Sequence, residues 1–169
     1  KQGAQAIAPL RHAIEIDGLA GENLILLAEA LRQAEQPEAA MRVARQAVSL
    51  AGSPQLLVAL ALDHHKAGFL SSAIVVLEQA LQVWPQDAAI VGSLGALQIE
   101  AGESVTGEVN LRRALALEPG RAQWYGNLGL ALAAQRRFDE ALEAARAALR
   151  IEPENAAWQE LFTQLEALH

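Results

Sequence analysis

Hydrophobic residues recur along this chain at the spacing of an α-helix. Near the N-terminus, Ile7, Leu10 and Ile14 stand three and then four residues apart, so they fall on one face of a helix. Residues 156–169 likewise place an apolar stripe opposite a polar one. The apolar stripe consists of Trp158, Leu161, Phe162, Leu165 and Leu168, and the polar one of Gln159, Glu160, Thr163, Gln164 and Glu166. Similar stripes lie between these two segments, and the pattern predicts an all-α protein.

The helical pattern repeats along the chain at a constant period. Four sets of like residues, each with three members, are equally spaced. The sets are Pro85, Pro119 and Pro153; Ala80, Ala114 and Ala148; Leu81, Leu115 and Leu149; and Leu60, Leu94 and Leu128. Several such sets at one period indicate a repeat protein, in which each unit buries its apolar face against its neighbours.

Residues 122–155 resemble one complete tetratricopeptide (TPR) repeat, a helix–turn–helix unit of about 34 residues. The resemblance is carried by Leu128-Gly129 in the first helix, by Phe138-Asp139-Glu140-Ala141 at the start of the second helix, and by Ala148 and Pro153 after it. It implies a right-handed TPR superhelix, an α–α solenoid of helix–turn–helix repeats. The first helix of each repeat would then line a concave groove.

The resemblance implies a single TPR domain over residues 1–169. The expected segments are 1–18, the second helix of a partial repeat; 21–53, 54–87, 88–121 and 122–155, the complete repeats; and 156–169, a C-terminal capping helix. The first complete repeat is one residue short. We expect the missing residue in the loop that ends this repeat, because loops tolerate deletions best.

Local signals add expectations for single elements. Proline inside a helix removes a hydrogen bond, so we expect the first helix to begin near Pro9, with proline in its first turn. Ser71 or Ser72 is expected to cap the second helix of its repeat. Gly107 stands where the family usually has alanine, at the closest contact between the two helices of a repeat. Glycine at this place lowers helix propensity by roughly 0.5–1 kcal/mol relative to alanine.

A tryptophan occurs in the first helix of repeat 122–155 and another in the expected capping helix 156–169. Trp124 and Trp158 occupy equivalent places in their repeats. We expect Trp158 to pack against the end of the preceding second helix, near Leu149. The helix that carries Trp158 is expected to cap the array, because the last repeat of a solenoid otherwise exposes its core.

Composition and charge exclude several functions. The chain has 169 residues, of which 52% are hydrophobic and 20% charged, as in ordinary folded proteins. Its net charge is −7, and its basic pairs, Arg112–Arg113 and Arg136–Arg137, are interpreted as solvated charges. Nucleic acid is therefore not an expected partner, since binding to it needs a basic face. Membrane insertion is not expected either, because no apolar run is long enough for a membrane-spanning helix, and there is no cysteine for disulfide or thiolate chemistry.

The resemblance to TPR proteins places certain positions of each first helix on the concave surface. Glu29, Gly92 and Gly126 are among them. A carboxylate clamp, the best-known peptide site of the family, is not expected, because only Asn127 supplies a clamp-type side chain. The candidate peptide-binding groove consists of Val58, Leu62, His65, Lys66, Ala96, Ile99, Asn127, Leu130 and Ala133. These residues either receive a hydrophobic peptide or an amphipathic helix, or pack the solenoid against itself.

No pattern in the sequence predicts catalysis. Asp63-His64-His65 resembles a metal motif, but adjacent side chains on a helix point about 100° apart, so the two histidines cannot easily bind one ion. Gly126-Asn127-Leu128-Gly129 is not preceded by a strand, so it is not interpreted as a phosphate-binding loop. We therefore expect a protein that is not an enzyme and that has no metal and no cofactor.

The expected function is that of a non-enzymatic scaffold for protein–protein interaction, which binds a peptide or helix in its concave groove. The alternative is the TPR adaptor region of a larger bacterial enzyme, such as a transferase or hydroxylase, or of a secretion or envelope-assembly protein. The chain begins at Lys1 without methionine, so we expect it to be a piece of a longer protein. The partner is expected to be another protein or peptide, with self-association left open. The expected location is the cytoplasm, with the periplasm as the alternative.

Overall fold

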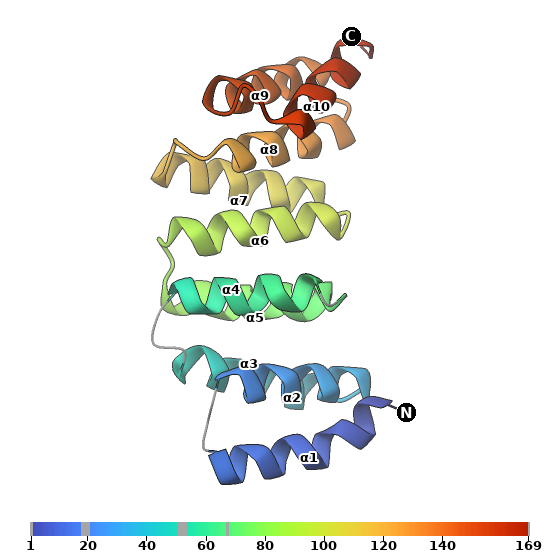
Figure 1. Ribbon diagram of the computed structural model, residues 1–169, viewed down its shortest axis with the longest axis vertical. Coiled ribbons are helices and arrows are strands. Elements are labelled where there is room, and N and C mark those ends of the chain that lie inside the picture. The colour runs from blue at the N-terminus through green and yellow to red at the C-terminus, as the bar shows by residue number, and fades with distance from the viewer. Residues whose placement is uncertain (1, 18–20, 51–53, 67, 169) are drawn as a thin grey trace. The chain divides into compact units, whose positions relative to one another are not determined.

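The computed structural model describes residues 2–17, 21–50, 54–66 and 68–168. The regular structure in this part of the chain consists of α-helices, which confirms the predicted all-α fold (Figure 1). The chain divides into two compact units, Lys1–Pro85 and Gln86–His169. None of the helices in the described ranges combines the length and the apolar character needed to cross a membrane.

The first unit contains helices α1 to α5. Their bounds are Gln2–Asp17 for α1, Gly21–Gln33 for α2, Pro37–Leu50 for α3, Pro54–Lys66 for α4 and Leu70–Val83 for α5. Successive helices contact each other in the pairs α1–α2, α2–α3 and α4–α5. Helix α5 also contacts α2 and α3, so α5 joins two hairpins into one packed body.

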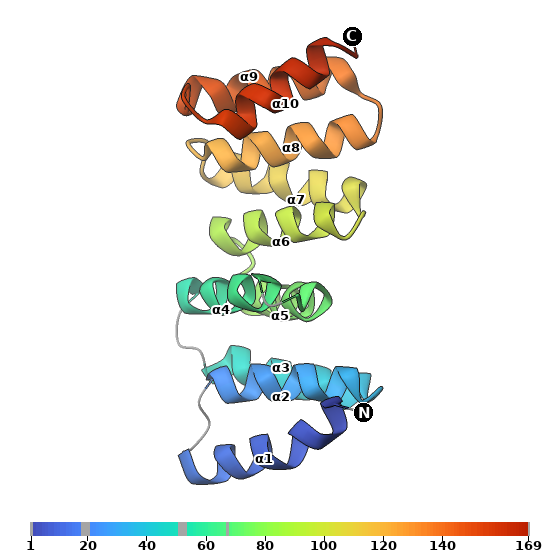
Figure 2. The ribbon, with the colours of Figure 1, turned by 45° about the vertical axis from the view of Figure 1, so that its right-hand side comes forward.

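The apolar stripe predicted near the N-terminus packs on the core of the first unit. Its members Ile7, Leu10 and Ile14 lie against the buried residues Leu27, Leu31 and Ala40. The expectation that the helix begins near Pro9 is wrong, because α1 extends to Gln2 and Pro9 lies inside it. Figure 2 shows α1 changing direction in its N-terminal part. Packing of the stripe holds the helix together, so proline bends it rather than ends it.

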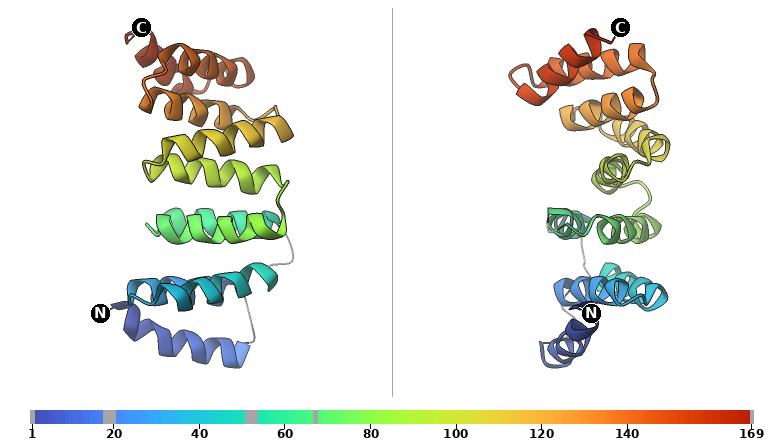
Figure 3. Two further views of the ribbon diagram at one scale, coloured as in Figure 1. Left: turned by 180° about the vertical axis from the view of Figure 1, so that it is seen from behind. Right: turned by 90° about the vertical axis from the view of Figure 1, so that its right-hand side faces the viewer.

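The second unit contains helices α6 to α10. Their bounds are Ala88–Glu100 for α6, Ser104–Leu117 for α7, Ala122–Ala134 for α8, Phe138–Ile151 for α9 and Ala156–Glu166 for α10. Each helix contacts the next one in the chain, and α8 also contacts α6 and α10 (Figure 3). The helices α6, α8 and α10 therefore follow one another in space, which sets the positions of the candidate site.

Four helix hairpins share one kind of turn. The residue with a left-handed backbone is Glu35 in α2–α3, Gly68 in α4–α5, Gly102 in α6–α7 and Arg136 in α8–α9, with φ between 60° and 88°. In each turn the following N–H group donates to the carbonyl oxygen five residues earlier, at 2.8 to 3.0 Å. This bond is part of the Schellman motif, which satisfies carbonyl groups at the end of a helix. The loop 51–53, where we expected the missing residue, lies outside the described residues.

The expected serine cap of α5 is wrong. This helix begins without a hydrogen bond from a side chain to its first turn. Ser72 is buried instead, and its hydroxyl group donates to the carboxylate of Glu29 in α2. Side-chain caps are found at α6 and α10, where Asp87 and Asn155 each accept a hydrogen bond of 3.0 Å from a backbone N–H group.

Glycine sets the closest approach of α6 and α7. A Cβ atom on Gly107 would lie 2.6 Å from Cγ1 of Ile99 and 2.8 Å from the carbonyl oxygen of Gly95. Real Cβ atoms do not approach so closely, so even alanine would push the two helices apart. The replacement of the usual alanine by Gly107 therefore follows from the tight crossing of this pair.

Candidate functional site

The predicted groove residues lie on three helices in the two units. Val58, Leu62, His65 and Lys66 lie on α4 in the first unit. Ala96 and Ile99 lie on α6, and Asn127, Leu130 and Ala133 on α8, in the second unit. We call these last five residues the first-helix face. Because α6 and α8 contact each other, the structure brings the two parts of this face onto neighbouring helices.

Exposure differs sharply along the first-helix face. The side chain of Leu130 is 43% exposed, although its neighbours Ala131 and Leu132 are buried. The other four members of the face are partly buried. Ile99 lies against Gly107 of α7, so part of its surface serves the packing of the α6–α7 hairpin. On this face, Leu130 is therefore the large apolar side chain that the core does not use.

Two glycines that we expected on the concave surface are covered by tryptophan. A Cβ atom on Gly92 would clash with the indole of Trp124, and a Cβ atom on Gly126 would clash with the indole of Trp158. Both glycines are buried. Each indole thus rests on the backbone of the preceding first helix, and these two positions cannot contact a peptide.

The two tryptophans hold equivalent places, as expected, and the indole of Trp158 lies on Gly126 of α8. The expected contact of Trp158 with Leu149 stays a prediction. The indole N–H group of Trp158 also donates to Glu152 at 3.1 Å, at the end of α9. Trp124 is buried, with the guanidinium group of Arg121 over its ring at 5.2 Å. Glycine and tryptophan are equally far apart in the sequence in both pairs, and this equal spacing is the signal that could have revealed the contact.

Glu29 is also not on an open surface. Its side chain is 3% exposed, and its carboxylate accepts hydrogen bonds from Ser72 of α5 and from Gln33, the latter at 2.9 Å. A carboxylate is buried only when its oxygens are hydrogen-bonded. Glu29 therefore links α2 to α5 in the first unit, and we remove it from the expected concave surface.

The metal-like motif gains no support from its surroundings. His64 lies edge-on to the ring of Phe69, with the ring centres 6.2 Å apart. The side chain of Asp63 lies outside the described residues. In the described part of the chain, no three histidine, aspartate or glutamate side chains are placed to hold a metal ion.

A buried carboxylate joins three segments of the second unit. Glu108 of α7 is 7% exposed, and it accepts hydrogen bonds from Arg112 at 2.8 Å, from Gln135 at 2.8 Å and from Arg137 at 2.7 Å. Arg112 and Arg137 also bond to Glu140 of α9, at 3.1 and 2.7 Å. The side chains of Arg112 and Arg137 are 48% and 38% exposed, so they are in contact with solvent as interpreted, and their bonds also join α7 to α9.

The pKa of Glu108 lies below its ordinary value. Burial alone would raise this pKa, but the hydrogen bonds from Arg112, Gln135 and Arg137 stabilise the ionised form and outweigh burial. The same arginines lower the pKa of Glu140, with the hydrogen bond from Arg137 as the largest cause. Both carboxylates are thus held in the charged form, which suits a structural clamp and not proton transfer near neutral pH.

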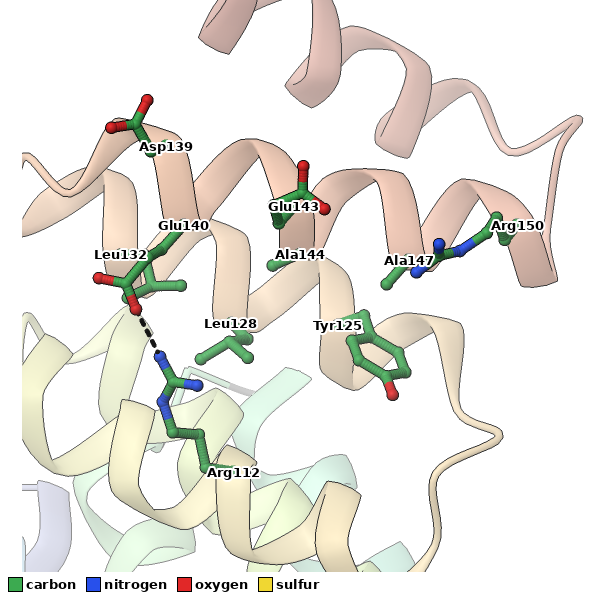
Figure 4. Close-up of a pocket in the computed structure, with 10 residues that line it drawn as sticks. All are labelled: Arg112, Tyr125, Leu128, Leu132, Asp139, Glu140, Glu143, Ala144, Ala147 and Arg150. Atoms are coloured by element: carbon green, nitrogen blue, oxygen red, sulfur yellow. Dashed lines mark hydrogen bonds and ion pairs between the residues drawn. The ribbon is translucent and has the colours of Figure 1, made fainter.

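A cleft of about 420 Å³ lies beside this clamp, on the side of the second helices (Figure 4). We call it the α7–α9 cleft. It is lined by Arg112 of α7, by Tyr125, Leu128 and Leu132 of α8, and by Asp139, Glu140, Glu143, Ala144, Ala147 and Arg150 of α9. The sequence reasoning missed this cleft, because it considered only first helices as binding surfaces.

The comparisons with known proteins support the TPR resemblance. A family model described as tetratricopeptide repeat matches residues 122–155. A search of curated protein sequences found no match. The family match identifies residues 122–155 as a tetratricopeptide repeat. The helix hairpins of this chain have the fold of solved TPR domains.

Solved structures with the same fold come from different kinds of protein. The first TPR domain of Spaghetti (RPAP3), bound to the HSP90 peptide SRMEEVD, is 18% identical, with a TM-score of 0.64 over 68% of this chain and 90% of that chain. MamA from Desulfovibrio magneticus RS-1 is 18% identical, with a TM-score of 0.65 over 87% and 84% of the two chains. An O-GlcNAc transferase variant from Thermobaculum terrenum is 25% identical, with a TM-score of 0.63 over 66% of this chain and 21% of that chain.

Proposed function

We propose that this protein is a non-enzymatic scaffold that binds a hydrophobic peptide or an amphipathic helix of another protein on the first-helix face of its second unit. The observation that carries the proposal is Leu130, a leucine left 43% exposed in a helix whose neighbouring residues are buried. Exposure of a large apolar side chain costs free energy, and a partner that covers Leu130 would recover it.

The chemistry around Leu130 supports an apolar ligand. Ala96 and Ala133 are small and partly buried, so they leave room beside the leucine for side chains of a partner. An amphipathic helix that enters such a groove places apolar residues at helical spacing on its floor. Asn127, also partly buried, carries an amide group that can donate to and accept from the backbone of a bound peptide.

The structural neighbours support a role in peptide binding. The ligand that we expect for this chain differs in chemistry from the peptide bound by the neighbour. The Spaghetti (RPAP3) domain was solved with an HSP90 peptide that has an acidic C-terminal part. The first-helix face of this chain contains no arginine or lysine among its five residues. We therefore expect binding here to depend on apolar burial, at about 25 cal/mol per Å², and little on ion pairs.

The test combines a peptide screen with charge substitutions. An array of amphipathic helical peptides, probed with the wild-type protein, selects a ligand whose affinity is then measured for each variant. We expect Leu130→Glu and Ala133→Glu to weaken binding more than about tenfold, because each buries a charge under the ligand. Thr106→Glu is the matched control, since it adds the same charge at an exposed position of α7. Equal effects of all three variants would contradict the proposal.

A second candidate follows from the transferase neighbour. This chain aligns with 21% of the O-GlcNAc transferase, so TPR repeats of this kind also form parts of larger enzymes. Under this alternative the chain presents substrates to a catalytic domain encoded beside it. The complete reading frame decides between the two: a catalytic domain in the same frame favours the adaptor, and its absence favours the scaffold.

A further inference from the structure

The α7–α9 cleft has an apolar floor, and two alanines form part of its α9 wall. Leu128 and Leu132 form its base and are 5% and 1% exposed. From α9, the methyl groups of Ala144 and Ala147 border the cleft near its centre, with Glu143 beside Ala144 (Figure 4). A volume of about 420 Å³ lies near the lower end of the range for ligand sites, so it fits one large side chain and the backbone beside it.

Some charged side chains around the cleft have a hydrogen-bonding partner, and Arg150 has none among the described residues. At one end, Glu140 is bonded to two arginines, and Glu143 accepts a hydrogen bond of 3.0 Å from Arg146. At the other end, Arg150 forms no hydrogen bond or ion pair with the described residues, and neither does the hydroxyl group of Tyr125. Figure 4 shows the guanidinium group of Arg150 turned back over Ala147, at the end where Tyr125 lies.

These observations define a ligand chemistry. A guanidinium group and a phenol hydroxyl at one end of an apolar cleft can donate together to a carboxylate, and bonds to charged groups are the stronger ones. Glu140 and Glu143 repel such a ligand only weakly, because arginine side chains pair with both carboxylates. A ligand fits this cleft if it packs an apolar side chain against Leu128 and places a carboxylate next to Arg150.

We propose that the α7–α9 cleft is a second binding site, which takes an internal segment of a partner protein where a large apolar residue adjoins aspartate or glutamate. The site is separate from the first-helix face, and neither depends on the other. The apolar side chain fills the space over Ala144 and Ala147. The acidic side chain accepts hydrogen bonds from Arg150 and Tyr125.

The probe for this site is an acetylated and amidated hexapeptide with adjacent phenylalanine and glutamate, so that its only carboxylate is the glutamate side chain. Binding is followed by amide chemical shifts of the ¹⁵N-labelled protein. We expect saturable shifts at Tyr125, Ala144 and Ala147. A probe with glutamine in place of glutamate should bind about tenfold more weakly, since one charged hydrogen bond is lost. Equal binding of the two probes would overturn the proposal.

Substitutions of arginine provide the matched control. Arg150→Gln should weaken binding of the probe about tenfold, whereas Arg11→Gln, which removes the same charge at an exposed position of α1, should change it less than about twofold. Ala147→Leu should block the probe while the circular dichroism spectrum is retained. Equal losses for the two arginine variants would contradict the proposal. So would binding that requires a free C-terminal carboxylate on the probe.

The two proposed sites can fail independently. Leu130→Glu should leave binding of the hexapeptide to the cleft unchanged, and Arg150→Gln should leave binding of the amphipathic helix unchanged. Loss of hexapeptide binding in Leu130→Glu would show that the probe occupies the first-helix face, and the assignment to the cleft would then be wrong.

Discussion

At the scale of single residues, the hairpin turns require a left-handed backbone, but the residue at that position is not always glycine. All four turn positions have a positive φ, but glycine occupies only two of them, Gly68 and Gly102. Glu35 and Arg136 adopt the same left-handed conformation with a side chain, which costs roughly 1–2 kcal/mol for most residues. The Schellman hydrogen bonds are present in all four turns, so the same local backbone bonds form with and without glycine at the left-handed position.

The turns therefore predict opposite effects of reciprocal substitutions. Arg136→Gly should raise the free energy of unfolding by about 0.5–1 kcal/mol, since the removal of the left-handed penalty outweighs the backbone freedom that glycine gives the unfolded chain. Gly102→Ala should lower it by about 1 kcal/mol, although no atom within 4 Å would touch the new Cβ atom. Urea denaturation of both variants measures the two changes. A loss of stability in Arg136→Gly would contradict this view of the turn.

The glycine–tryptophan contact leads to a second prediction at this scale. Gly126→Ala should lower the free energy of unfolding by about 1–3 kcal/mol, because the new methyl group would displace the indole of Trp158. Gly120→Ala is the control, since a Cβ atom there meets nothing within 4 Å. If the two substitutions differed by less than about 0.5 kcal/mol in urea denaturation, the indole would not be docked on Gly126.

Single-residue roles were the part that the sequence predicted least well. The family resemblance places Gly92, Gly126 and Glu29 on the concave surface, but it carries no information about what covers them. Tryptophan fills the space over both glycines, and Ser72 from another helix reaches Glu29. Such contacts depend on the pairing of residues far apart in the chain, which periodicity alone does not reveal.

At the scale of helices, the apolar packing follows the stripes predicted from the sequence. The polar contacts between helices were not predicted. The constant period of the sequence predicted hairpins because Leu94 and Leu128 recur on the buried side of successive first helices. Glu108, in contrast, looks like an ordinary surface residue in the sequence. Its burial becomes evident only when Gln135 and Arg137 from the next hairpin are seen to bond to it.

The clamp around Glu108 predicts how stability depends on pH. Because the pKa of Glu108 is lowered on folding, its ionised form stabilises the folded state above the unfolded pKa, and this stabilisation is lost as the pH falls through the lowered value. Glu108→Gln should lower the free energy of unfolding by about 1–2 kcal/mol at neutral pH.

The measurement compares urea denaturation of wild type and Glu108→Gln at neutral and acidic pH. The difference between the two proteins should shrink as the pH falls below about 4.5, the ordinary pKa of glutamate, because glutamine does not titrate. The pKa of Glu140 is lowered as well, so both proteins should still lose some stability in acid. A difference that stays constant with pH would show that the charge of Glu108 does not stabilise the fold.

At the scale of the whole molecule, the sequence was enough to predict the fold class and the TPR repeat at residues 122–155, and the binding surface stayed a prediction. Repeated sets of leucine, alanine and proline were enough to predict the fold class, since they reflect packing that recurs in each hairpin. The candidate binding residue does not recur: Leu130 is exposed, whereas the matching positions in the α6–α7 and α4–α5 hairpins hold Ala96 and Leu62, which are partly buried. Periodicity alone could therefore not show which hairpin binds a partner.

The salt dependence of ligand binding tests the central claim most directly. The protein carries a net charge of −7, but the first-helix face is apolar, so its affinity for an amphipathic helix should depend on burial and not on screened charges. We expect the Kd of the ligand selected by the peptide array to change less than about threefold between low salt and about 0.5 M salt, and Leu130→Glu to abolish the binding. Binding that collapses in high salt yet survives Leu130→Glu would place recognition on a charged surface and contradict the account.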